Sequence, residues 1–182
     1  DVAGEWSLPG CKVTLDLPRL SPREGAARGA GSMVVGIAPT GGSLPPHWLA
    51  ELVAAAEAGL DVVSGLHSRL GSFPELAQAA ARSGVRLIDV RHSEKVFGAA
   101  TGRKRSGKRL LTVGTDCALG KKYTALAIAK NLKSRGIAAT FRATGKTGVM
   151  ISGAGVAIDA VIADFIAGAA EELSPDNAPD HW

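Results

Sequence analysis

Short apolar runs, separated by turns that contain glycine or proline, repeat along the first half of the chain. These runs predict strands at residues 12–17 (KVTLDL), 32–38 (SMVVGIA), 61–64 (DVVS) and 86–90 (RLIDV). The stretches between them predict helices at residues 22–30, 48–58 and 74–83. Gly59 and Gly84 follow two of these helices directly and predict their C-terminal ends. Strands that alternate with helices through short connections indicate parallel βαβ units.

The second half of the chain begins with a segment of different composition. Residues 98–108 (GAATGRKRSGK) are small, polar and basic, which predicts a solvated linker. Beyond it, the pattern predicts strands at residues 109–113 and 138–142 and helices at residues 121–134 and 157–172. We therefore expect two α/β domains, residues 1–100 and residues 101–182. Because the second domain ends on a helix, we also expect it to continue beyond residue 182.

Composition and charge narrow the class of protein only moderately. The chain is 46% hydrophobic and 21% charged, a balance typical of globular proteins, and its net charge of +4 is mild. The two cysteines, Cys11 and Cys117, form neither a disulfide framework nor a metal-type pair, which favours a reducing, cytoplasmic setting. Asp159 and Asp164 interrupt the most apolar stretch and argue against a membrane span. We expect a small-molecule substrate rather than nucleic acid or a membrane, and homo-oligomerisation stays open.

The most informative motif runs from Gly114 to Thr124 (GTDCALGKKYT), between a predicted strand and a predicted helix. Glycines let the backbone fold around an anion, and the first N–H groups of the helix point toward it. Lys121 follows Gly120 and would bring a positive charge to a terminal phosphate. The spacing Gly-x5-Gly-Lys is that of a phosphate-binding loop with one extra residue, similar to the loops of dethiobiotin synthetases.

One residue of this motif departs from the usual pattern. The hydroxyl that follows the lysine in such loops binds Mg²⁺, and here that position holds Lys122. A second cation repels a metal ion. We therefore expect no metal ligand at this site and favour a phosphorylated cofactor, such as coenzyme A, over metal-assisted nucleotide hydrolysis.

Other candidate residues follow predicted strand ends, where ligands gather in open α/β sheets. In the second domain these residues are Arg142, Thr144, Gly145, Lys146 and Thr147. In the first domain they are His67, Arg69, Arg91 and His92, which could bind a carboxylate or move a proton. Asp159 and Asp164 differ by about 140° around a helix axis, so we expect no paired-carboxylate site. One of them could reach the pocket, and the favoured interpretation is that both are solvated. The first domain lacks Gly-x-Gly-x-x-Gly, which disfavours a nicotinamide site.

Three segments together resemble the DgcN-like family: Gly114–Thr124, residues 142–148 (RATGKTG) and residues 63–70 (VSGLHSRL). The resemblance covers about residues 13–182 and implies a Rossmann-like N-terminal domain followed by a parallel-sheet P-loop domain. It also implies transfer of an acetyl group from acetyl-coenzyme A to the amine of a D-amino acid, above all D-glutamate. Where this chain has Lys146, the family pattern commonly has glutamine, which could alter ligand choice.

The resemblance and the motifs together predict roles for particular residues. The predicted cofactor-binding residues are Gly114, Thr115, Cys117, Gly120, Lys121, Lys122, Tyr123 and Thr124. The predicted substrate-binding residues are Arg69, Arg91, Arg142, Thr144, Gly145 and Thr147. The amine must lose a proton before it attacks, and the candidate bases are Asp116 and His67. Two alternatives stay open: an ATP- and Mg-dependent carboxylate-activating enzyme resembling dethiobiotin synthetase, and a nucleotide-sensing module without catalysis.

Overall fold

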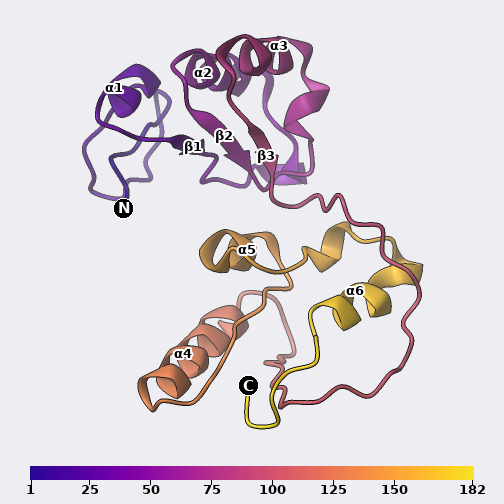
Figure 1. Ribbon diagram of the computed structural model, residues 1–182. Helices are drawn as coiled ribbons and strands as arrows, with labels where there is room; N and C mark the ends of the chain where they lie inside the picture. Colours follow the sequence, from indigo (N-terminus) through magenta and orange to yellow (C-terminus); the bar gives the residue numbers. More distant parts are fainter. The chain divides into compact units, whose positions relative to one another are not determined.

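The computed structural model describes residues 1–182, and the chain divides into two units, Asp1–Val90 and Arg91–Trp182 (Figure 1). The first unit is built on a three-stranded parallel sheet of β1 (Ser32–Val34), β2 (Asp61–Ser64) and β3 (Leu87–Asp89), in that order. The division between the units falls ten residues before the predicted boundary at residues 100 and 101.

Two helices connect the strands of this sheet. α2 (Pro46–Glu57) leads from β1 to β2 and α3 (Pro74–Ser83) leads from β2 to β3. Because parallel crossovers are right-handed and the strand order is sequential, both helices lie on the same face of the sheet, where they pack together (Figure 1). A short helix, α1 (Pro22–Ala27), precedes β1, and the 3-10 turns η1 (Thr40–Gly42) and η2 (Leu70–Ser72) follow β1 and β2.

The core of the first unit lies between the sheet and these helices. Val62 in β2 and Leu76 in α3 are fully buried, and Ala55, Ala56 and Ala79 allow the two helices to approach closely. Burial of this kind is the main stabilising contribution in a small domain. The predicted strands and helices of this unit are therefore present between residues 22 and 89. β2 and α3 have the predicted bounds, α1, β1 and β3 are shorter than predicted, and α2 begins two residues earlier than predicted.

The predicted strand at residues 12–17 is wrong. These residues bond to a side chain instead of to a neighbouring strand: the Glu5 carboxylate accepts from Thr14 Oγ1 at 2.6 Å and from the Leu15 N–H at 2.5 Å. The backbone contact of this region is a single bridge between Glu5 and Arg19. Alternation alone predicted the strand, but a strand also needs a partner for its backbone groups.

The second unit is largely helical. Its helices are α4 (Lys121–Ser134), α5 (Lys146–Ser152) and α6 (Ile166–Glu172), and its 3-10 turns are η3 (Ile158–Ala160) and η4 (Ala163–Phe165). The predicted helix at residues 121–134 is confirmed at both ends. The single helix predicted at residues 157–172 is wrong, since Val161 adopts an extended conformation between η3 and η4. The β-branched pair Val161 and Ile162 fits this break, because such side chains are restricted in helices.

The strands predicted at residues 109–113 and 138–142 are also not formed. Residues 109–113 make no backbone hydrogen bond to another segment. Within residues 138–142, the Thr140 N–H donates to the Trp182 carbonyl at 2.8 Å, and the Trp182 N–H donates to Ala138 at 2.9 Å. These two hydrogen bonds join a single pair of positions, whereas a β-ladder needs successive pairs of residues. The α/β class nevertheless holds for the chain, because it rests on the parallel sheet and the helices of the first unit.

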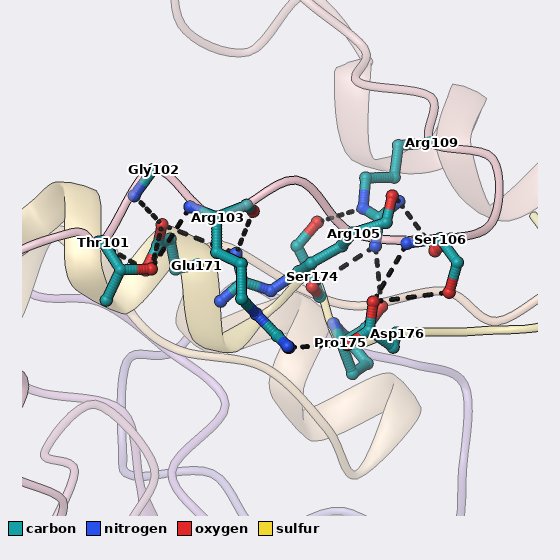
Figure 2. Close-up of polar contacts among 10 residues, drawn as sticks. All are labelled: Thr101, Gly102, Arg103, Arg105, Ser106, Arg109, Glu171, Ser174, Pro175 and Asp176. Carbon is teal, nitrogen blue, oxygen red and sulfur yellow. Dashed lines mark hydrogen bonds and ion pairs between the residues drawn. The ribbon is translucent and has the colours of Figure 1, made fainter.

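The basic segment before residue 109 is held by hydrogen bonds, in contrast to the predicted solvated linker (Figure 2). The Glu171 carboxylate accepts from the backbone N–H groups of Thr101 and Gly102 at 2.9 and 2.7 Å and pairs with Arg105 at 3.5 Å. These hydrogen bonds, the one from the Thr101 N–H foremost, lower the pKa of Glu171 to about 2. Arg103 pairs with Asp176 at 2.6 Å. The segment is thus attached to α6 through Glu171 and to the residues after α6 through Asp176.

Candidate functional site

The loop from Gly114 to Gly120 leads directly into α4. Gly120 stands at the N-cap of this helix with φ 94°, a left-handed conformation that favours glycine. No side chain caps the helix N-terminus. The N–H groups of the first turn therefore remain available for an anion, which the helix dipole also favours. This is the geometry that the Gly-x5-Gly-Lys spacing predicts.

Lys121 folds back over the loop. Its ammonium donates a hydrogen bond to the Asp116 carbonyl, and its own carbonyl accepts from Thr112 Oγ1 at 3.0 Å. A Cβ at Gly114 would lie 3.2 Å from Lys121 Cδ and 3.2 Å from Leu119 Cδ1, tighter than most carbon contacts. Because Gly114 has no side chain, the aliphatic part of Lys121 can pass across the loop.

A cavity of about 900 Å³ adjoins the loop within the second unit. Predicted cofactor-binding residues on its wall are Gly120, Lys121, Lys122 and Tyr123. Predicted substrate-binding residues on its wall are Arg91, Arg142, Thr144, Gly145 and Thr147. The structure therefore brings the two separately predicted groups to one cavity, the first at the start of α4 and the second around the start of α5 together with Arg91. Gly114, Thr115, Cys117 and Thr124 do not line it.

The charges around this cavity are strongly unequal. The cationic residues on its wall are Arg91, Lys108, Arg109, Lys121, Lys122, Arg142 and Lys146. The single acidic residue on its wall is Asp159. Ligand pockets have volumes of about 300–1,000 Å³, so this cavity has the size and the charge for an extended anionic ligand.

Asp159 reaches the cavity although its side chain remains 58% exposed, so it is both solvated and part of the cavity wall. Residues 157–172 do not form one helix, and Asp159 in η3 reaches the cavity wall, where its carboxylate pairs with the Arg91 guanidinium. The Arg91 side chain is only 6% exposed. Lys146, the first residue of α5, lines the same cavity and is half-buried. Burial, and then the charge of Arg91, lower the pKa of Lys146, while Asp159 acts in the opposite direction.

The two predicted bases lie elsewhere. Asp116 is exposed and does not line the cavity, and its Oδ1 accepts from the Cys117 N–H at 2.6 Å. His67 belongs to the first unit, where its side chain is exposed and its backbone N–H donates to the Gly42 carbonyl at 2.8 Å. Arg69 is an exposed residue of the same unit. The catalytic roles of Asp116 and His67 and the binding role of Arg69 stay predictions.

A parallel βαβ unit followed by a glycine–lysine loop at a helix N-terminus defines a two-domain α/β protein with a phosphate-binding loop. The chain belongs to the DUF1611 family. Residues 6–93 match its N-terminal domain, described as Rossmann-like, and residues 96–182 match its C-terminal domain, described as a P-loop domain. Both are domains of unknown function. The predicted order of a Rossmann-like and a P-loop domain is thereby confirmed.

Two curated relatives carry a functional name. The chain is 50% identical over 179 residues to a D-glutamate N-acetyltransferase of a Pseudoalteromonas species and to another of Tritonibacter scottomollicae. Each alignment covers 98% of the chain and 54% of the relative, so the chain spans about half the length of these relatives. These matches confirm the family resemblance found in the motifs.

A solved structure shares the fold. The chain is 41% identical to a DUF1611 family protein from Anabaena variabilis, with a TM-score of 0.78. The likeness covers 85% of the chain and 46% of that protein. No helix of the chain combines the length and the apolar character needed to cross a bilayer.

Proposed function

We propose that the protein is an acyltransferase that moves an acetyl group from acetyl-coenzyme A to the amine of a D-amino acid, with D-glutamate as the preferred acceptor. The observation that carries this proposal is the cationic cavity, in which the phosphate loop and a second group of cations share one wall. Such a cavity can accept an anionic donor together with an anionic acceptor. The names of the two curated relatives support the same reaction.

The residues of the loop fit the diphosphate of coenzyme A. The uncapped first turn of α4 offers N–H donors, Gly120 leaves room for close approach, and Lys121 and Lys122 add positive charge. Tyr123 also lines the cavity, and its ring lies 4.3 Å from Lys122 Nζ. No hydroxyl stands directly after Lys121 to bind Mg²⁺. A diphosphate ester needs the donors and the charge but no metal ion.

Acetyl-coenzyme A would supply the acetyl group as a reactive thioester. The residues of the chain would bind and orient the two substrates. Arg91 and Arg142 lie on the wall where acceptor carboxylates would be held, and Thr144 and Thr147 offer hydroxyl groups nearby. The acceptor amine must lose a proton before attack, and Asp116 and His67 are the proposed bases.

A turnover assay tests this proposal. The purified protein would be mixed with acetyl-coenzyme A and a panel of D- and L-amino acids, with release of free thiol and the acetylated product both measured. We expect transfer to D-glutamate that persists in the presence of a chelator. Turnover that depends on ATP and Mg²⁺ would instead support the carboxylate-activating alternative. Tight nucleotide binding without turnover would support the sensing module.

A further inference from the structure

Asp159 is the only acidic residue on the wall of the cavity beside the phosphate loop. It lies in η3, whereas the cationic residues of the wall come from other segments of the second unit. Neither of the proposed bases, Asp116 and His67, lines this cavity. The roles proposed above therefore leave the one carboxylate of the cavity without a function.

The position of the Asp159 carboxylate suits the binding of a ligand. Its Oδ2 accepts a hydrogen bond from Arg91 Nη1, and the Arg91 side chain is almost fully buried. The Asp159 side chain is itself more than half exposed. An ionised carboxylate has about four acceptor positions, and this contact uses one of them. The ion pair thus holds the carboxylate at the cavity wall and leaves acceptor positions for the N–H groups of a ligand.

The charges of the cavity give this carboxylate a task that no other residue of the wall can perform. An acceptor amino acid brings an ammonium group as well as carboxylates. Its carboxylates are attracted by any of the cations on the wall, but its ammonium is repelled by all of them. Arg91 and Asp159 are in contact, so they present a positive and a negative group side by side. This arrangement complements the neighbouring carboxylate and ammonium of an α-amino acid.

We infer that Asp159 binds the amine of the acceptor amino acid and so makes the cavity selective for amino acids over dicarboxylates that lack an amine. This inference rests on the proposed function and extends it, because that proposal names residues that hold the carboxylates and none that holds the amine. The same carboxylate also suits the amine after it has lost a proton, since a neutral amine still has N–H groups to donate. The lone pair of that amine then stays free to attack the thioester.

The test compares the binding of D-glutamate with that of glutarate, the same dicarboxylate without the amine. Calorimetric titrations with each ligand would be made in the presence of coenzyme A, which keeps the phosphate loop occupied. Asp159→Asn removes the negative charge and keeps the size of the side chain. Asp164→Asn is the matched control, because Asp164 is exposed in η4 and does not line the cavity.

The parent protein should bind D-glutamate more tightly than glutarate, and Asp164→Asn should keep this preference. Asp159→Asn should reduce the preference about 10- to 150-fold, the usual effect of losing a hydrogen bond to a charged group. If Asp159 only holds Arg91 in place, the affinities for both ligands should change together and their ratio should stay the same, a result that would overturn the inference. A parent protein that binds D-glutamate no more tightly than glutarate would overturn it too.

A second variant keeps the test decisive if Asp159→Asn does not fold. That substitution takes an ion-pair partner from the almost fully buried Arg91 guanidinium, which destabilises the fold. The double variant Arg91→Gln/Asp159→Asn removes both charges and avoids this penalty. We expect it to bind both ligands more weakly and to lose the preference for D-glutamate. A preference retained in the folded double variant would contradict the role of Asp159.

These titrations separate the inference from the proposed function, because they need no turnover. A preference for D-glutamate that Asp159→Asn abolishes supports the role of Asp159 even if no acetyl group is transferred, and in that case only the proposed reaction fails. Acetyl transfer to D-glutamate, combined with a preference that Asp159→Asn leaves unchanged, overturns the inference and leaves the reaction standing.

Discussion

Replacing Lys121 with methionine removes the ammonium group from the phosphate loop and keeps most of the aliphatic stem. In the structure that ammonium donates to the neutral Asp116 carbonyl, so a bound phosphate would replace this hydrogen bond with a stronger one between two charged groups. A hydrogen bond to a charged group contributes about 1.5–3 kcal/mol. At about 1.4 kcal/mol for each factor of ten, Lys121→Met should weaken coenzyme A binding about 10- to 150-fold.

Isothermal titration calorimetry with coenzyme A measures this effect directly, with and without Mg²⁺. Lys130→Met is the control, since it removes the same charge from an exposed position of the same helix. The control should change affinity by less than about twofold, because exposed charges are screened by salt. Two results would refute the reasoning: coenzyme A binding that is unchanged in Lys121→Met, or binding that appears only with Mg²⁺.

Three further predictions concern stability. The folded-state pKa of Glu171 is about 2 against an ordinary value of 4.5, so its contribution is present above pH 4.5 and is lost as the pH falls toward 2. As the pH is lowered across this window, the melting temperature should therefore fall less steeply for Glu171→Gln than for the parent protein. Parallel curves of melting temperature against pH would contradict the prediction. Leu76 is completely buried in α3, so Leu76→Ala should lower the free energy of unfolding by about 2–5 kcal/mol in a urea titration. A much smaller decrease would contradict the place of Leu76 in the core. Gly84 ends α3 with φ 69°, so Gly84→Ala should cost about 1 kcal/mol in the same titration, and a stabilised variant would show that the left-handed turn is not required.

Local sequence signals predicted several elements at residue precision. Pro74 and Gly84 bracket α3, and Gly120 precedes α4, because proline and glycine act on the backbone within one turn. The predicted strand at residues 61–64 matches β2, since its two β-branched residues, Val62 and Val63, favour a strand. The phosphate loop was also predictable, because its glycines, its lysine and the following helix are contiguous in the chain.

Non-local pairing explains what the sequence did not predict. Residues 12–17 have a strand pattern, but Glu5 binds their polar groups and no strand lies beside them. The basic segment near Arg105 had the composition of a solvated linker, yet Glu171 holds it from 66 residues further along the chain (Figure 2). The sequence of each segment does not indicate that Glu5 or Glu171 binds it.

The sequence by itself determined the order of the βαβ elements, the phosphate loop and its lysine, because each depends on neighbouring residues. Only the tertiary structure decided that Asp159 pairs with Arg91 and that Lys146 lies on the same cavity wall. The two residues of the ion pair are 68 positions apart. Their contact depends on the break between η3 and α6 and on the path of the chain around α5, and no local pattern encodes such a path.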